Sequence, residues 1–286
     1  MSSELVHDAD ASVTALLHMK MEQEARAGLV SPMFYREVVI NGPSLAYKVS
    51  KHPVTADAGT LTDGTALSNV GINPTTVSAT AAGIGLKSII TKFATSGSLL
   101  TEQEAIGNFA RGLINKMDVD GCSLLDNLGG AAGTSATDLG VGDVLNAIYD
   151  LEEANEASNM VAVFDPLQVY DLRSAIVTSS APVWGNEGGS PVAGLLNAAQ
   201  SGAFKGSLFG VPIYVTSNVV DDATNKIGGL FNAGRALLWA WKWYPTVETR
   251  PEPDYGAEAK MLVVSAAYGI IEVHDLAGVA VTSGNT

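Results

Sequence analysis

Apolar residues recur every three to four positions between residues 101 and 128, and this spacing predicts one long helix near the middle of the chain. Thr101 and Glu104 form a capping box at its start, and Gly129-Gly130 supplies a stop after its end. At 1.5 Å per residue such a helix would be roughly 40 Å long. The expected buried stripe consists of Ile106, Phe109, Ala110, Leu113, Ile114, Met117, Leu124, Leu125 and Leu128. The polar residues expected outside the stripe are Glu102, Asn108, Arg111, Asn115, Asp118 and Asp126.

The chain before this helix is rich in Thr, Ser, Gly and β-branched residues, which predicts a long hairpin. Its strand arms are expected at residues 45–49 and 75–80, with the second arm extended through residues 86–93. Residues 56–74 form a charge-poor tip between the arms. A projecting hairpin has no core of its own, so it must dock onto something else. A disordered loop is the alternative for this segment.

Shorter elements occupy the two flanks of the hairpin and helix. We expect a loose arm at residues 1–10, a helix at 12–27, a linker at 129–137 and a helix at 143–154. A buried strand at residues 160–164 runs into Asp165-Pro166, an N-cap followed by proline, which predicts a further helix to about residue 177. Ser190-Pro191 opens another helix in the same way. The alternation of strands and helices is typical of a mixed α/β domain.

From residue 204 the pattern predicts mostly strands. We expect hairpins at residues 206–218, around Gly210, and at 226–241, around residues 232–234. Longer arms are expected at residues 246–250 and 259–267, joined by the stiff loop 251–256, and the chain ends with strands at 270–273 and 279–282. Trp239, Trp241 and Trp243 alternate and so share one strand face. We interpret that face as sheet core or subunit interface.

Composition adds two constraints. The chain is 47% hydrophobic with positive mean hydropathy, which indicates a surface partly covered by copies of itself. Residues 101–200 contain 14 acidic and 3 basic residues and hold most of the net charge of −14. Such a segment repels phosphate backbones, which argues against a DNA-reading protein but not against one that lies beside nucleic acid. The sequence has no run of eighteen apolar residues and no secretory signal pattern, so we expect no membrane segment.

No motif in the sequence marks an active site. The four histidines lie outside any ligand spacing, residues 118–120 lack the rest of a calcium loop, and no G-x-S-x-G elbow is present. The single cysteine, Cys122, lies on the apolar run of the long helix and is expected to be packed. We therefore expect no catalytic, cofactor-binding or metal-binding residues.

The order of these parts resembles the major capsid protein of tailed bacteriophages, the Hong Kong 97 type of fold. AIGNFARGLINKMDVDGCSLLDNL (105–128) is similar to the spine helix of that family, and VFDPLQVYDLRS (163–174) and GSLFGVPIYVTSN (206–218) are similar to parts of its axial domain. The resemblance implies an α+β fold with an N-arm, an extended E-loop hairpin, a peripheral domain of spine helix and long antiparallel sheet, and a mixed α/β axial domain. The implied ranges are 1–45 for the N-arm, 46–98 for the E-loop, 99–137 and 243–268 for the peripheral domain, and 138–242 and 269–286 for the axial domain.

The same resemblance implies a non-enzymatic building block that assembles as hexamers and pentamers into an icosahedral head around double-stranded DNA, without sequence-specific binding. The implied partners are a separate scaffolding protein and a portal, with a decoration protein as an optional addition, and the implied location is the virion, assembled in the host cytoplasm. No motif supports a lysine cross-link. The alternatives are an encapsulin-like compartment and a small α/β enzyme without a local motif. The candidate intersubunit contacts are Lys48, Lys51, Asp57, Asp63, Arg36, Arg111, Glu252, Asp254 and Tyr255.

Overall fold

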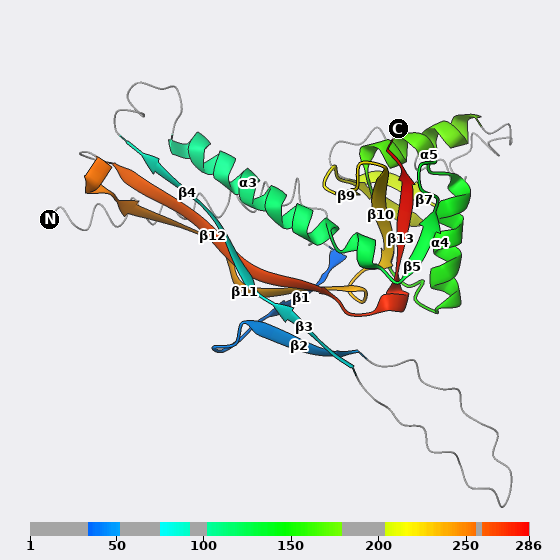
Figure 1. Cartoon of the computed structure of the whole chain (residues 1–286), viewed down its shortest axis with the longest axis horizontal. Helices are drawn as coiled ribbons and strands as arrows, with labels where there is room; N and C mark the ends of the chain where they lie inside the picture. Colours follow the sequence, from blue (N-terminus) through cyan, green and yellow to red (C-terminus); the bar gives the residue numbers. More distant parts are fainter. Residues whose placement is uncertain (1–33, 52–74, 92–101, 179–203, 256–258, 286) are drawn as a thin grey trace, which may run out of the picture.

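The computed structural model describes residues 34–51, 75–91, 102–178, 204–255 and 259–285. Its strands form a four-stranded sheet, a seven-stranded sheet and a separate two-stranded hairpin (Figure 1). The helices are α3 (Glu102–Cys122), α4 (Val141–Glu153) and α5 (Pro166–Thr178), with short 3-10 helices η2 (Leu125–Asn127), η3 (Pro253–Tyr255) and η4 (Asp275–Ala277). The predicted arm at 1–10, the helix at 12–27, the capping box at Thr101, the tip at 56–74 and the helix at Ser190-Pro191 lie outside the described residues.

The four-stranded sheet has the order β1-β11-β12-β4, and the seven-stranded sheet has the order β5-β13-β10-β6-β8-β7 with β9 on β10. The strands of the first sheet are β1 (Arg36–Val39), β4 (Ala82–Ile90), β11 (Leu237–Pro251) and β12 (Lys260–Glu272). Those of the second are β5 (Gly130–Gly133), β6 (Met160–Phe164), β7 (Phe204–Leu208), β8 (Val211–Val215), β9 (Val220–Asp221), β10 (Asn225–Asn232) and β13 (Gly278–Gly284). The hairpin consists of β2 (Ala46–Lys51) and β3 (Thr75–Thr80).

Helix α3 packs its apolar stripe against the four-stranded sheet, as the sequence predicted. Ala110, Leu113 and Met117 are buried in one cluster with Leu262 and Val264 of β12. The helix ends at Cys122, however, and not at residue 128. Leu125 and Leu128 leave the helical path to pack on β10, where a Cβ at Gly229 would meet their methyl carbons at 3.0 and 2.9 Å.

The segment after α3 contains two further corrections. The Gly129-Gly130 stop was wrong, because these residues lie beyond η2 and Gly130 opens β5. The predicted linker 129–137 contributes this strand, which pairs in parallel with β13. Gly133 has φ +81°, and a Cβ there would lie 2.1 Å from the Thr282 oxygen, so only glycine fits. The strand falls within the range 99–137 expected for the peripheral domain, but it belongs to the seven-stranded sheet.

Asp118 was expected on the polar side of the long helix, and this expectation was wrong. Its side chain is fully buried. The carboxylate accepts hydrogen bonds from Thr216 Oγ1 at 2.7 Å and from Asn218 Nδ2 at 2.9 Å. These bonds tie α3 to the chain that follows β8, and they explain why a charged residue can lie inside this helix packing.

The predicted hairpin at 226–241 is also corrected. Strand β10 is buried over most of its length between β13 and β6 of the seven-stranded sheet. Strand β11 belongs to the four-stranded sheet, where it pairs with β12. The turn between them carries the chain from one sheet to the other, and Gly234 adopts φ +83° there. A strand buried on both faces has the same apolar sequence pattern whether it pairs with the next strand in the chain or with distant strands.

The second arm of the predicted hairpin is shorter than expected. Strands β2 and β3 pair antiparallel from Ala46 opposite Thr80 to Lys51 opposite Thr75. The chain then passes the buried Ala81 and enters β4, which pairs with β12. Residues 86–90 therefore belong to the four-stranded sheet and not to the hairpin. Residues 75–80 and 86–90 are both rich in β-branched residues, so composition does not reveal where the strand changes its partner.

The expected long arms at 246–250 and 259–267 are confirmed as the paired strands β11 and β12. The shared face of the three tryptophans is confirmed only in part. Trp239 and Trp241 are buried, but Trp243 is 43% exposed, because the β11–β12 register shifts between Trp241 and Trp243. A bulge of this kind reverses the alternation of side chains. On α4, Val144, Ile148 and Leu151 face the core, whereas Leu145 is exposed.

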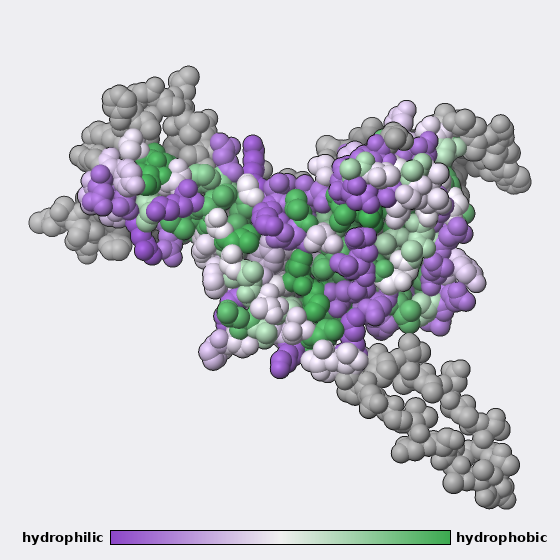
Figure 2. Space-filling model, viewed as in Figure 1, coloured by the Kyte–Doolittle hydropathy of each residue, from purple (hydrophilic) through white to green (hydrophobic). Residues whose placement is uncertain are grey.

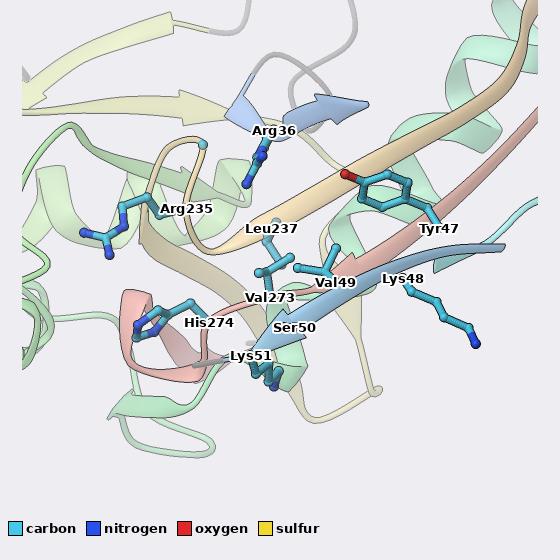
Figure 3. Close-up of a pocket in the computed structure, with 11 residues that line it drawn as sticks. Arg36, Tyr47, Lys48, Val49, Ser50, Lys51, Arg235, Leu237, Val273 and His274 are labelled. Atoms are coloured by element: carbon cyan, nitrogen blue, oxygen red, sulfur yellow. The ribbon is translucent and has the colours of Figure 1, made fainter. Parts of the chain in front are cut away.

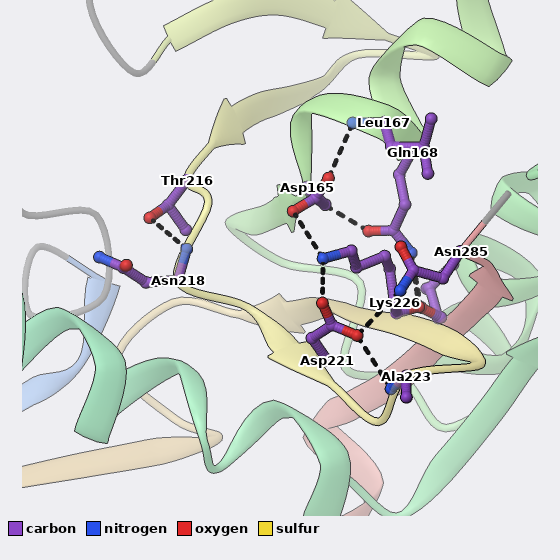
Figure 4. A network of polar contacts seen from close by, with 10 residues as sticks. Asp165, Leu167, Gln168, Thr216, Asn218, Asp221, Ala223, Lys226 and Asn285 are labelled. Carbon is purple, nitrogen blue, oxygen red and sulfur yellow. Dashed lines mark hydrogen bonds and ion pairs between the residues drawn. The ribbon is translucent and has the colours of Figure 1, made fainter.

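The start of α5 has the predicted cap (Figure 4). Leu167 donates its backbone N–H to Asp165 Oδ1 at 2.8 Å, and the Asp165 N–H donates to Gln168 Oε1 at 3.0 Å. Lys226 lies 3.9 Å from Asp165 and 2.5 Å from Asp221. The predicted 206–218 hairpin is likewise confirmed, with positive φ at Phe209 and Gly210 between β7 and β8. Within the described part of the chain, no helix is long and apolar enough to cross a membrane.

Replacing the cap residue tests this account of α5. Asp165→Ala removes the acceptor for the Leu167 N–H and should lower the free energy of unfolding by about 1–2 kcal/mol. The matched variant Asp165→Asn keeps an oxygen acceptor and should cost clearly less. Denaturant unfolding monitored by circular dichroism measures both. Equal losses in the two variants would assign the effect to the Lys226 ion pair and not to the cap.

Candidate intersubunit site

Within the described residues, the β2–β3 hairpin is anchored on its own chain by a small hydrophobic cluster at its root and by an ion pair of Lys51, at the far end of β2, with Asp275. Ala79 and Ala81 are buried against Leu238 and Ala240 of β11 and Ile40, and Tyr47 and Val49 pack partly against the same cluster. Beyond this root, Thr75 and Thr76 are exposed, as is Lys48. A two-stranded hairpin is marginally stable alone, so the described part of the arm depends on this small cluster and on whatever covers its remaining surface.

A cleft of about 490 Å³ opens beside this root (Figure 3). Strand β2 forms one wall, and the β10–β11 turn, the start of β1 and the end of β12 form the rest. Its lining residues are Arg36, Tyr47, Lys48, Val49, Ser50, Lys51, Gly234, Arg235, Leu237, Val273 and His274. The lining contains four Lys or Arg side chains and no Asp or Glu, in a chain whose net charge is −14. Negatively charged groups are therefore favoured there.

Two of these cations are held by carboxylates just outside the cleft. Lys51 forms an ion pair with Asp275 of η4. Arg235 Nη1 lies 3.0 Å from Glu156 Oε2, and the same oxygen accepts a hydrogen bond from Asn232 Nδ2 at 3.2 Å. Because Glu156 is buried, these contacts fix the β10–β11 turn against the end of α4.

Arg36 and Lys48 are free to meet a partner. Among the residues that the structure describes, neither side chain takes part in an ion pair, and both are exposed. Figure 3 shows Arg36 extending from β1 toward the cleft, whereas the side chains of Arg235 and Lys48 point outward on opposite sides.

One carboxyl group behind the cleft is electrostatically strained. Burial and, to a smaller extent, the nearby Asp275 carboxyl group raise the pKa of Glu272 to about 6, with Lys51 opposing the shift. One Glu272 oxygen is buried without a hydrogen-bond partner within the described ranges. The group lies at the end of β12, where β2 meets η4, so its protonation state acts on the ion pair that holds the hairpin.

The structure brings some of the sequence-based candidates together and separates others. Arg36, Lys48 and Lys51 meet at the cleft. Glu252, Asp254 and Tyr255 lie together at the opposite end of β11. Arg111 is exposed on α3, away from both groups, and Asp57 and Asp63 lie outside the described residues.

The sequence reasoning missed Arg235 and His274, which line the cleft, and Glu156, which lies just outside it. His274 Nε2 lies 3.9 Å from Glu156 Oε1, so the three residues form one junction. They come from three distant segments and share no spacing, so no local signal could have found them. As for metals, no cluster of three or more potential ligands occurs among the described positions. Burial raises the pKa of the Cys122 thiol, which confirms the packed interpretation of that residue.

The strained carboxyl gives a pH-dependent prediction for the unassembled chain. A raised pKa means that the folded state holds its proton more tightly, so this contribution to stability is present below about pH 4.5 and is lost as the pH rises through about 6. Glu272→Gln should remove the dependence and raise the free energy of unfolding at pH 7 by about 1 kcal/mol, a value reduced because the carboxyl is partly solvated. Thermal unfolding at pH 4.5 and 7 measures it, with the exposed Glu248→Gln as control. An equal shift at both pH values would contradict the assignment.

Comparison with known proteins supports the fold but gives no sequence relative. No protein-family model matches the chain, and no curated protein matches it. Solved structures do. The mature capsid of bacteriophage PhiM1 matches with a TM-score of 0.65 and 11% identity, covering 91% of this chain and 88% of that chain. The capsid of cyanophage P-SCSP1u matches with a TM-score of 0.64 and 12% identity, covering 91% and 89%.

A virus-like particle from Pyrococcus furiosus is also similar, with a TM-score of 0.61 and 13% identity over 96% of this chain and 99% of that chain. These matches extend over both sheets and the long helix and so do not depend on one shared motif. The chain has the Hong Kong 97-type capsid fold.

Proposed function

We propose that this chain is the major capsid protein of a tailed bacteriophage head and assembles into an icosahedral shell of hexamers and pentamers. The observation that carries the proposal is the capsid fold, matched over 91% of the chain by phage capsids. The encapsulin-like compartment is not favoured, because the similar structures are mainly those of phage capsids and heads. The small-enzyme alternative has no described cluster of catalytic groups to support it.

The exposed surface supports assembly. Hydrophobic residues reach the surface on the face seen in Figure 2, among charged ones. Large apolar side chains exposed on the isolated chain include Val39, Leu45, Leu86, Val119, Leu145, Tyr149, Tyr170, Trp243, Tyr244, Tyr255 and Leu276. Neighbouring copies in a shell would cover such residues.

The proposed division follows the capsid family. The β2–β3 arm acts as the E-loop and lies on the adjacent copy, and α3 acts as the spine helix. The acidic middle third of the chain would repel packaged double-stranded DNA and leave it mobile. A separate scaffolding protein and a portal complete the assembly in the host cytoplasm. The proposed ranges are 1–45 for the N-arm, 46–98 for the E-loop, 99–137 and 243–268 for the peripheral domain, and 138–242 and 269–286 for the axial domain.

Electron microscopy of the expressed chain tests the function directly. We expect closed shells of uniform diameter in negative stain, formed either by the chain alone or together with a scaffolding protein. Sedimentation velocity provides the matching measurement in solution. A chain that stays monomeric under both conditions contradicts the proposal, and shells that enclose protein cargo and never DNA would favour the compartment.

Removing the hairpin tip separates folding from assembly. Replacing residues 56–74 by a four-residue Gly-Ser connection leaves both sheets and their cores unchanged, so the far-ultraviolet spectrum and the unfolding midpoint should stay near those of the parent chain. Shell formation should be lost, because the arm no longer reaches the adjacent copy. Loss of folding, or normal shells, would each contradict the assignment of this segment as an intersubunit arm.

A further inference from the structure

We propose that the cleft beside the hairpin root is a docking site for the acidic tip of the β11–β12 hairpin of a second copy. The tip is defined by Glu252, Asp254 and Tyr255. This inference rests on the proposed shell function, because it needs copies of the chain held side by side. The proposed ligand of the cleft is thus an anionic loop with an aromatic side chain, and the proposed partner of the tip is the cleft of another copy.

The lining of the cleft suits such a loop. Val49, Leu237 and Val273 supply an apolar floor, and Leu237 is almost fully buried. Arg36 and Arg235 also line the cleft, and Arg235 is 56% exposed despite its contact with Glu156. A cavity of about 490 Å³ is within the range of ordinary ligand sites, so one aromatic side chain and a neighbouring carboxylate fit in it.

The tip has the complementary chemistry. Tyr255 is 60% exposed, and Asp254 is exposed beside it on η3. Neither Glu252 nor Asp254 is in an ion pair with any residue that the structure describes. An exposed tyrosine flanked by carboxylates can insert its ring over apolar side chains while its neighbours meet guanidinium groups. Aromatic and arginine side chains are the residues that most often dominate binding between proteins.

The tip is also held in one conformation before it binds. The Glu252 N–H donates to the Ala259 oxygen at 2.8 Å, and the Tyr255 N–H donates to the Glu252 oxygen at 3.3 Å. Pro251 and Pro253 restrict the backbone on either side of Glu252. Less conformational freedom is then lost on docking than for a flexible loop.

The tip cannot reach the cleft of its own chain. Leu237, which lines the cleft, begins β11, and Pro251, which precedes the tip, ends it. A strand of 15 residues spans roughly 45–50 Å at about 3.3 Å per residue. Figure 1 shows the η3 end of β11 and β12 far from β2. The contact therefore joins two copies through different surfaces, and contacts of this kind close into rings or extend into larger assemblies.

Engineered cysteines test the contact without changing its charges. Ser50 lines the cleft and Pro253 lies on the tip, and both are exposed. Mild oxidation of shells formed by the double variant Ser50→Cys, Pro253→Cys should give a ladder of covalent dimers, trimers and larger species on a non-reducing gel. Each single variant should stay monomeric, and the native Cys122 is fully buried and should not react. A double variant that assembles but gives no ladder overturns the proposal.

Charge reversal supplies the functional test. Arg36→Glu with Lys48→Glu replaces two of the four positive charges around the cleft with negative ones, and Glu252→Lys with Asp254→Lys makes the tip basic; each pair should lower the yield of shells by about tenfold. All four substitutions together should restore shells, because the attraction is re-formed with its signs exchanged. A control reversal away from both surfaces, Glu152→Lys with Glu153→Lys on α4, should assemble normally.

The outcomes distinguish the docking contact from the function on which it rests. If the wild-type chain forms no shells with its scaffolding protein, the proposed function and the contact both fail. If wild-type shells form and the paired reversals assemble equally well, only the contact is overturned. The same holds if the fourfold variant, folded by circular dichroism, recovers no shells beyond the level of the two paired reversals.

Discussion

The structure depends on one hydrophobic core that joins the long helix to both large sheets. Trp239 lies near its centre, fully buried, with its ring stacked on Tyr268 at 4.6 Å and 6.0 Å from the ring of Tyr35. Around it, α3 contributes Leu113 and Met117. The same cluster includes residues of β6 and β10 in the seven-stranded sheet. Separating the two sheets would therefore expose apolar surface to water.

Two parts of the chain extend away from this shared core. Strands β11 and β12 run beyond it, paired with each other to the η3 tip, and the β2–β3 arm leaves it at the other end. Such projections bury little of their own surface, so they suit a protein whose remaining contacts come from other copies. The seven-stranded sheet keeps a second core with α4 and α5 and does not need such a partner.

The junction between the sheets gathers polar groups from distant segments. Glu156, Asn232 and Arg235 connect the end of α4 to the crossing turn, and Lys51 and Asp275 connect the end of β2 to η4. The cleft opens between these two groups. Its positive lining is therefore a consequence of how the sheets meet, and it favours negatively charged groups in an otherwise strongly acidic chain.

Local sequence patterns determined the elements whose signals are contained within one segment. The buried stripe of α3, the Asp165 cap of α5 and the Phe209-Gly210 turn follow from neighbouring residues alone, because helix periodicity, capping and positive φ act over a few positions. The order of these elements was also sufficient to indicate the capsid fold.

Strand partners were decided only by the tertiary structure. Residues 86–90 joined β12 and not the hairpin, β10 and β11 separated into two sheets, and residues 130–133 became a strand beside β13. Burial of Asp118 depended on Thr216 and Asn218, about one hundred residues away in the chain. The backbone hydrogen bonds between strands do not depend on which side chains are present, so apolar segments of similar composition can pair in several ways. The combination that buries the most surface around one core is fixed by the whole chain at once.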